Sequence, residues 1–229
     1  MARALILSGG IFHPFDESSA ALAEIFAEVG LTSEVTADFE AGLSKIDPEA
    51  FDLVAVNALR WGMMTGDKYE PYRDEWAFQM PDDGRRRLVD FVEQGGALFG
   101  LHTASICFDD WPEWGDLLGG AWAWGVSHHP PLATINVSVD NRTHPITSGV
   151  GGFEVEDEIY HHLSPRADVE VLLTAQNTEE GRQPIAWVRE QGRGRVVYDA
   201  LGHDGASLRQ ADHRTLIRNA ARWALNSGR

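Results

Sequence analysis

The most constraining feature of the chain is a short apolar segment that leads into a histidine among small residues. Residues 97–99 follow the Gly-rich loop 94–96 and predict a buried strand. In the next stretch, 100–104, small residues allow a sharp turn from the strand into a helix. Such a turn holds one side chain out at the carboxyl edge of a parallel sheet. That side chain is His102, which indicates proton chemistry or polar recognition rather than covalent attack.

Strand-like and helix-like segments alternate over the first hundred residues, which predicts a parallel sheet covered by helices on both faces. The expected strands are residues 3–7, 33–36 and 53–57, and the expected helices are 18–29, capped by Ser18 or Ser19, and about 83–94. Residues 57–81 form a long irregular segment rich in Trp, Tyr and Met. A loop of that length is often functional.

The second half of the chain has a different pattern, in which strand-like segments follow one another with few helical signals between them. The expected strands are residues 134–139, 169–174, 184–189 and 195–201, with a hairpin loop at 191–194. Asp212 is expected to cap a final amphipathic helix that places Trp223 in the core. We therefore expect one α/β domain over residues 1–229, with a mostly parallel sheet and an antiparallel section in its C-terminal half.

Composition restricts the classes of partner. A chain of 229 residues can bury a full core, and its net charge of −16 argues against nucleic acid or an anionic membrane as a partner, because the electrostatic contribution would be repulsive. The first residues lead directly into a strand without a signal peptide's apolar segment, and no other run is long enough to span a bilayer. The single Cys107 rules out an internal disulfide. These features predict a cytoplasmic protein.

Six segments, spread in order over nearly the whole chain, form a specific pattern together. They are residues 102–120, Ser127-His128-His129-Pro130, His144-Pro145-Ile146, Asp157-Glu158-Ile159-Tyr160, Pro184-Ile185-Ala186-Trp187 and residues 192–203. This set resembles the trehalose-utilisation (ThuA-like) family. The resemblance implies the flavodoxin-like three-layer sandwich of the class I glutamine-amidotransferase-like superfamily. It also implies a role in the catabolism of trehalose, related disaccharides or their keto derivatives.

One departure from the superfamily pattern is informative. An amidotransferase presents a cysteine at the turn after the strand, because a thiolate must attack the amide. His102 occupies that position here, and Cys107 lies five residues further on. We therefore expect no glutaminase activity. Histidine can both give and take a proton near neutral pH, which suits acid–base catalysis, although His102 could instead only hydrogen-bond neighbouring loops.

A second histidine follows another predicted strand. His203 comes after residues 195–201 and is preceded by Gly202, which lets the backbone turn tightly. If this strand is parallel to the one before His102, both histidines lie at the same edge of the sheet. The alternative is a capping or turn histidine beside Asp204.

A carboxylate and a phenol come from residues 157–160. Alternation along an extended segment places Glu158 and Tyr160 on one face and Asp157 on the other, where Asp157 and Glu156 are expected to be solvated. Glu158 could orient an imidazole or act as a base, and Tyr160 could donate a hydrogen bond to a sugar oxygen.

The other histidines are weaker candidates. His13 follows the first strand and would also lie at the carboxyl edge, although its neighbour Pro14 gives an equally good explanation as a turn. His129 precedes two prolines in a rigid segment and could reach a ligand. His144 is typical of a turn, and the surface or capping histidines are expected to be His128, His161 and His162.

Eight tryptophans are a second signal. Trp187 and Trp223 are expected in the core, whereas six lie in or beside predicted loops: Trp61, Trp76, Trp111, Trp114, Trp122 and Trp124. Flat aromatic faces suit sugar rings, so Trp111 is a candidate substrate contact; packing or a subunit interface is the alternative. A largely exposed segment from Trp111 to Trp124 would leave an apolar patch, which predicts a homo-oligomer.

Cofactors are not indicated by any local motif. Residues 8–10 lack the spacing of a dinucleotide fingerprint, so any oxidation would belong to a partner sugar dehydrogenase. No HxxxH, HxH or CxxC spacing is present, and a zinc or manganese site from histidines and Glu158 would have to be assembled by the fold.

These observations predict a protein that acts on a small-molecule carbohydrate. His102, His203 and Glu158 would carry out the proton transfers, and the substrate-binding residues would be Tyr160, His13, His129 and Trp111. The alternative is a non-catalytic sugar-binding or assembly protein whose histidines only hydrogen-bond a ligand.

Overall fold

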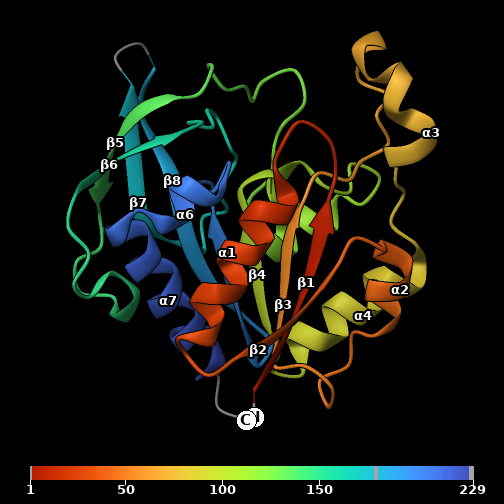
Figure 1. Ribbon diagram of the computed structural model, residues 1–229, viewed down its shortest axis with the longest axis horizontal. Helices are drawn as coiled ribbons and strands as arrows, with labels where there is room; N and C mark the ends of the chain where they lie inside the picture. Colours follow the sequence, from red (N-terminus) through yellow and green to blue (C-terminus); the bar gives the residue numbers. More distant parts are fainter. Residues whose placement is uncertain (1, 178–179, 227–229) are drawn as a thin grey trace.

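The computed structural model describes residues 2–177 and 180–226, which form one mixed sheet flanked by helices (Figure 1). The strands within these residues are β1 (Arg3–Gly9), β2 (Thr32–Thr36), β3 (Leu53–Ala58), β4 (Ala97–Leu101), β5 (Ala133–Val139), β6 (Phe153–Asp157), β7 (Glu170–Asn177), β8 (Gly181–Gln191) and β9 (Gly194–Asp199). The α-helices are α1 (Phe15–Ala27), α2 (Phe39–Ser44), α3 (Arg73–Trp76), α4 (Asp82–Glu93), α5 (Glu113–Leu118), α6 (Gly205–Arg209) and α7 (Ala211–Leu225). Three 3₁₀ segments are η1 (Asp67–Tyr72), η2 (His102–Ile106) and η3 (Pro145–Thr147).

The N-terminal half of the sheet is parallel. Strands β2, β1, β3, β4 and β9 lie in this order, which is the 2-1-3-4-5 order of flavodoxin-like folds with β9 in the fifth place. The chain crosses the sheet in opposite directions after β1 and after β2, so right-handed connections place α1 and α2 on opposite faces. Helices α6 and α7 pack with α1, and α4 packs with α2 (Figure 1). The predicted three-layer α/β sandwich is confirmed.

The C-terminal half of the sheet is antiparallel, as the sequence predicts. Strand β8 pairs with β9, and β7, β5 and β6 follow toward the far edge. Buried and exposed residues alternate along β5 and β6, whereas every residue of β3 is buried. This difference follows from the covering layers, because the parallel strands have helices on both faces and the outer antiparallel strands face water on one side.

Two predicted helix caps are wrong. Helix α1 already begins at Phe15, so Ser18 and Ser19 lie buried inside it, where both hydroxyls accept hydrogen bonds from the Asn57 side chain at 2.9 Å. Helix α7 begins at Ala211 and is capped by Gln210. The expected cap, Asp212, instead accepts a hydrogen bond from the backbone N–H of Gly151. None of the described helices is long and apolar enough to cross a membrane.

The tryptophans are distributed differently from the prediction. Trp61, Trp114 and Trp187 are almost completely buried, and Trp111 is only 4% exposed. The segment from Trp111 to Trp124 therefore leaves no large apolar patch at its N-terminal end, and a homo-oligomer stays a prediction without that support. Trp223 is only partly buried, with the Arg195 guanidinium 4.6 Å from its ring centre.

Burial predicts different costs for removing two of these rings. Trp187 is fully buried, packs on Tyr198 with ring centres 4.4 Å apart, and donates a hydrogen bond to the carbonyl of Leu118. Trp187→Ala should lower the free energy of unfolding by about 3–5 kcal/mol. Trp223→Ala should cost clearly less, because part of its ring already faces water. Urea denaturation of both variants measures the difference, and equal costs would contradict it.

Candidate functional site

The turn after β4 holds His102 in an uncommon backbone conformation. Its φ of +47° is in the left-handed region, which non-glycine residues rarely adopt. Its Nδ1 lies 2.7 Å from the carbonyl oxygen of Ala200. A carbonyl can only accept, so Nδ1 carries the proton and Nε2 presents a lone pair. The predicted turn is present, but the side chain is only 1% exposed and lies at the back of the site rather than at an open edge.

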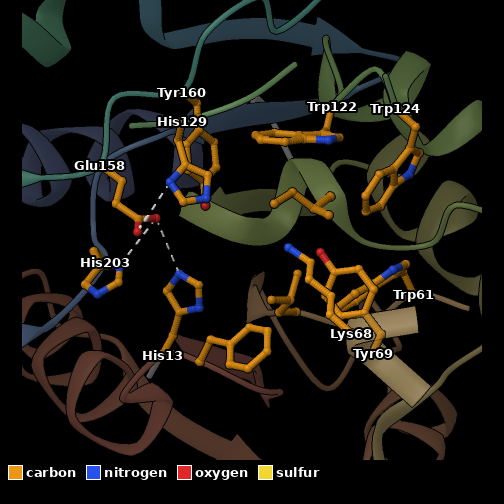
Figure 2. A pocket seen from close by; sticks show the side chains of 13 residues that line it. His13, Trp61, Lys68, Tyr69, Trp122, Trp124, His129, Glu158, Tyr160 and His203 are labelled. Carbon is orange, nitrogen blue, oxygen red and sulfur yellow. Dashed lines mark ion pairs between the residues drawn. The ribbon is translucent and has the colours of Figure 1, made fainter. Parts of the chain in front are cut away.

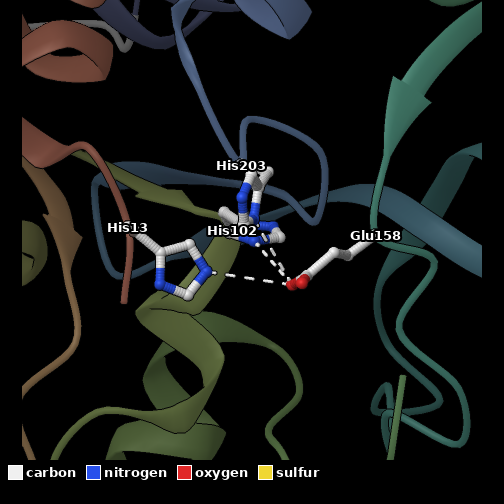
Figure 3. Close-up of side chains that lie close together, drawn as sticks. All are labelled: His13, His102, Glu158 and His203. Atoms are coloured by element: carbon white, nitrogen blue, oxygen red, sulfur yellow. Dashed lines mark ion pairs between the residues drawn. The ribbon is translucent and has the colours of Figure 1, made fainter. Parts of the chain in front are cut away.

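Three further side chains converge on His102 (Figure 3). His13 follows β1 and His203 follows β9, and because both strands run parallel to β4, all three histidines lie at the carboxyl edge of the sheet. Their ring centres lie 4.6 to 5.6 Å apart. Glu158, which directly follows β6, reaches the same point from the antiparallel half. The three histidines therefore lie at one edge of the sheet, as predicted, and the structure brings Glu158 to the same place.

One carboxylate oxygen is surrounded by imidazole nitrogens. Glu158 Oε2 lies 3.5 Å from His102 Nε2, 3.5 Å from His203 Nδ1 and 3.8 Å from His13 Nε2. Among the described residues, three of these buried atoms have no hydrogen-bond partner: Glu158 Oε2, His13 Nε2 and His203 Nδ1. The other oxygen, Oε1, lies 3.4 Å from Nδ1 of His129. The cluster is therefore a set of closely spaced polar atoms whose hydrogen-bonding capacity is unfilled.

The charges within the cluster follow from burial and contact. Burial alone would raise the pKa of Glu158, but the contacts with His102, His13 and His203 outweigh it and hold the pKa well below its usual range. Burial lowers the pKa of His13, and Glu158 offsets this only in part. The contact with Glu158 raises the pKa of His203. Near neutral pH the carboxylate is therefore ionised, His13 is neutral, and His203 is the better proton donor.

The hydrogen-bond partner of His13 fixes the direction of its lone pair. Its Nδ1 lies 3.2 Å from the carbonyl oxygen of Ile11, so the neutral ring carries its proton there and turns a bare Nε2 toward Glu158. An acceptor facing a carboxylate needs a proton or a cation between them. Imidazoles whose second nitrogen is held by a backbone carbonyl are also the usual form of a metal-ligating histidine. His13, His102, His203 and Glu158 are therefore the residues that could hold a divalent cation.

Tyr160, which lines the cavity, contacts the ring of His102. Its hydroxyl lies 3.1 Å from His102 Nε2, and the two rings stack with centres 4.6 Å apart. Burial raises the pKa of Tyr160 well above its usual value, so the hydroxyl stays protonated and donates to Nε2.

The cluster opens into a cavity of about 260 Å³ with two chemically different ends (Figure 2). Glu158, His13, His129 and His203 form one end, and aromatic side chains form the other. The cavity is lined by Phe12, His13, Leu59, Trp61, Lys68, Tyr69, Ile106, Trp122, Trp124, His129, Glu158, Tyr160 and His203. The predicted candidates His129 and Tyr160 line it, and the long segment 57–81 contributes part of the aromatic end. Lys68 and Tyr69 were not identified from the sequence, because only the richness of that segment in aromatic residues pointed to it.

The candidate Trp111 does not line this cavity. Its ring packs against Phe108 and Trp114 in the interior, with ring centres 6.4 and 5.8 Å away. A loop position therefore did not mean exposure, because the turn before α5 folds Trp111 inward.

Asp157 is fully buried, which contradicts its predicted position on a solvated face. Its Oδ1 accepts the backbone N–H of Glu158 at 2.8 Å, and its Oδ2 accepts that of Gly202 at 2.8 Å. The N–H of His203 also points to Oδ1, at 3.4 Å. Asp157 therefore joins the end of β6 to the turn after β9 and fixes the two backbones that carry Glu158 and His203. No local pattern marked this role.

The histidines expected at the surface form a second group. His161 is fully buried, and His128, His161 and His162 all contact the carboxylate of Glu180. The prediction is wrong for His161, and the contact with Glu180 joins segments that are far apart in the sequence. His144, by contrast, caps η3 through its Nδ1, as its predicted turn role requires.

Known proteins with the same pattern establish the family. A sequence model described as "Trehalose utilisation", that of ThuA, matches residues 3–224. The chain belongs to the ThuA family. A search of curated proteins found no match.

Solved structures share the fold of this ThuA-family chain at low identity. A ThuA-like protein from Parabacteroides merdae has a TM-score of 0.77 and 18% identity, over 98% of this chain and 90% of its own. A cytoplasmic protein from Salmonella typhimurium has a TM-score of 0.66 and 12% identity, over 98% and 99%. A beta-galactosidase from Rahnella sp. R3 has a TM-score of 0.65 and 14% identity, over 97% of this chain and 31% of its own.

The buried ion pair between His213 and Asp199, which Ser207 links to Asp157, predicts how the stability of the protein depends on pH. Ser207 donates to Asp157 and contacts His213, whose Nε2 lies 3.0 Å from Oδ2 of Asp199. Burial would lower the pKa of His213, but the attraction of Asp199 outweighs it and raises the pKa. A raised pKa contributes stability that is complete below pH 6.5, the unfolded value, and is lost as pH rises through the folded value.

His213→Gln should therefore lower the free energy of unfolding most at acidic to neutral pH. Leaving Asp199 buried without its partner costs about 3–5 kcal/mol, and the difference from the unmodified protein should shrink at alkaline pH. Urea denaturation at several pH values measures it. A cost that is independent of pH would show that His213 is uncharged in the folded protein.

Proposed function

We propose that this ThuA-family protein is a cytoplasmic enzyme of carbohydrate catabolism that acts on a disaccharide such as trehalose or on its keto derivative. The observation that carries the proposal is the cavity with two ends. The ionised Glu158 and three histidines form a reactive end, and a wall of aromatic rings faces it across the cavity. A concave apolar pocket with a few convergent polar groups is the usual form of a small-molecule site.

The aromatic end suits a sugar ring. Trp61 and Trp124 stack with ring centres 6.2 Å apart, and Trp122 lies edge-on to Trp124 at 6.3 Å (Figure 2). Flat aromatic faces pack against the C–H faces of sugars. Lys68 and His129 line the same cavity and could hydrogen-bond the hydroxyl groups. The ring nearest the cluster would then place its oxygen atoms between Glu158 and the histidines.

Proton transfer is the chemistry that the cluster supports best. Glu158 is ionised and accepts a proton from the substrate, for a keto-sugar the one on a carbon next to the carbonyl. His203, whose pKa is raised, gives a proton to the departing glycosidic oxygen. His102 is oriented by Ala200 and Tyr160 and does not line the cavity, so its role would be to relay a proton between Tyr160 and Glu158, while His13 positions the substrate. These steps break the glycosidic bond by elimination, as in a lyase, and addition of water to the unsaturated product would complete the reaction of a hydrolase. They include no glutaminase activity, because His102 stands where a nucleophilic cysteine would.

A divalent cation in the cluster is the second candidate, and the lone pair of His13 that faces Glu158 favours it. Three imidazoles and one carboxylate are a ligand set that zinc or manganese accepts. When bound, the cation would supply Lewis-acid polarisation of a substrate oxygen.

We also propose the partners and the cellular location of the protein. Residues 8–10 lack the spacing of a dinucleotide fingerprint, and we propose that a partner sugar dehydrogenase supplies any oxidation. The reduced, buried Cys107 and the Salmonella typhimurium structure described as cytoplasmic support a cytoplasmic location. The net charge of −16 disfavours nucleic acid and anionic membranes. A homo-oligomer is proposed without a structural observation of its own.

Glu158→Gln tests the catalytic role. It removes the charge with little change in shape, so turnover should fall by roughly 100- to 10,000-fold while substrate affinity changes much less. Trehalose and 3-keto-trehalose are incubated with the purified protein, with and without EDTA, and products are read by mass. Glu156→Gln, an exposed carboxylate on the same strand, is the matched control. Binding without turnover by the unmodified protein would support the non-catalytic sugar-binding or assembly alternative instead.

Trp124→Ala tests the aromatic end. The ring is 38% exposed and lines the cavity, so its removal should leave folding intact. Loss of one stacking face should weaken substrate binding by about tenfold, which corresponds to about 1.4 kcal/mol, with turnover at saturation little changed. Titration calorimetry with the substrate found above measures it. Trp111→Phe, in the interior, should bind normally; equal weakening by both variants would argue against a sugar contact at Trp124.

A further inference from the structure

A second group of histidines lies apart from the cavity and is called here the Glu180 cluster. It consists of His128, His161, His162 and Glu180. Glu180 Oε1 lies 2.8 Å from His128 Nε2, and Oε2 lies 3.1 Å from His161 Nδ1 and 3.0 Å from His162 Nε2. These residues come from the loop before β5, the segment after β6 and the turn before β8. The cluster shares no residue with the one around Glu158.

Backbone contacts hold the imidazoles of this cluster in place. The N–H of His161 donates to the carbonyl of His128 at 2.8 Å, and their rings stack with centres 5.1 Å apart and planes 9° from parallel. His162 has a φ of +55°, an uncommon conformation for a residue with a Cβ. Its N–H donates to Oε1 of Gln183, whose Nε2 donates to the carbonyl of Glu180 at 3.0 Å. Gln183 thus contacts both His162 and Glu180 and positions their backbones relative to each other.

Each imidazole turns one nitrogen toward the carboxylate of Glu180. His128 Nδ1 lies 3.2 Å from the carbonyl oxygen of Val126, so this nitrogen keeps its proton when a cation replaces the proton that Nε2 shares with Oε1 at 2.8 Å. His161 is buried and places its Nδ1 3.1 Å from the other oxygen of the same carboxylate, Oε2. A histidine whose second nitrogen bonds a backbone carbonyl is the usual form of a metal ligand.

We propose that His128, His161 and Glu180 bind a zinc ion, separate from whatever occupies the cluster around Glu158. Two ligand atoms on one tetrahedral zinc lie about 3.3–3.4 Å apart, given Zn–N and Zn–O distances of about 2.0–2.1 Å. Glu180 lies 2.8 Å from His128 and 3.1 Å from His161, and the ligand atoms of these three residues all lie within 4.8 Å of one another. Two histidines and one glutamate are an established zinc ligand set that leaves a fourth position open. His162 contacts the carboxylate of Glu180 as well. It would either orient that carboxylate or become the fourth ligand of the zinc ion.

The ion would fix one wall of the cavity. His128 directly precedes His129, which lines the cavity, and the same loop carries Trp122 and Trp124. Zinc at the Glu180 cluster would join this loop to the segment after β6, which carries Glu158 and Tyr160, and to the turn before β8. The ion would therefore stabilise the pocket without contacting the substrate.

Zinc titration of the metal-free full-length protein tests the proposal. Zinc chloride is added to the unmodified protein, Glu180→Gln and His128→Asn in a calorimeter, with Glu158→Gln to report on the other cluster. We expect both Glu180→Gln and His128→Asn to lose one equivalent of bound zinc, or to bind it at least tenfold more weakly, and Glu158→Gln to retain that equivalent. Glu154→Gln, an exposed carboxylate on β6, is the matched control and should bind like the unmodified protein.

Zinc stoichiometry and affinity that are the same in the unmodified protein, Glu180→Gln and His128→Asn would show that the Glu180 cluster is only a set of ion pairs. Circular dichroism checks folding, and because the His128 side chain is 48% exposed, His128→Asn carries the test if Glu180→Gln does not fold. Cobalt added in place of zinc gives visible absorption bands, and the bands that Glu158→Gln retains should be absent from both Glu180→Gln and His128→Asn.

Discussion

The site depends on a single buried charge, the carboxylate of Glu158. A carboxylate removed from water is costly unless neighbouring groups stabilise it. Here His13, His102, His203 and His129 surround it. The contacts with His102, His13 and His203 more than offset the burial, since the pKa of Glu158 is lowered rather than raised. The protein must therefore hold the four imidazoles in place, and the turns that carry three of them are fixed by the ends of parallel strands.

The two halves of the sheet divide this task. The parallel half supplies the histidines, because the carboxyl ends of β1, β4 and β9 meet at one edge. The antiparallel half supplies the carboxylate and much of the cavity wall. Asp157 joins the halves, since its buried carboxylate accepts backbone N–H groups from both the segment after β6 and the turn after β9. A second buried acid, Asp199, anchors that turn to α7 through His213.

The sequence predicted those parts of the fold and site that follow from local pattern and from the rule that parallel strand ends meet. The mixed sheet and the positions of His13, His102 and His203 were predicted in this way, whereas Glu158 was placed with them by the family resemblance.

The predictions that were wrong concern residues whose positions depend on contacts between distant segments. Asp157 was predicted to be in solvent because the alternation along one strand does not reveal that a turn packs over it. His161 was predicted to be at the surface because its bridge to His128 joins residues that are 33 apart in the sequence. Trp111 was misplaced because residence in a loop does not set burial.

The unfilled atoms of the Glu158 cluster define what a bound substrate or cation would have to satisfy. A proton on His203 satisfies one contact with Glu158, and the Tyr160 hydroxyl satisfies His102 Nε2. His13 Nε2 still faces the carboxylate with no proton between them, because Ile11 holds the ring's only proton on Nδ1. A substrate hydroxyl could donate to only one of these two acceptors, whereas a divalent cation satisfies both at once. EDTA applied to His128→Asn, in which the Glu180 cluster should no longer bind zinc, distinguishes them: lost turnover assigns this gap to a metal ion, and unchanged turnover assigns it to the proton that the substrate brings.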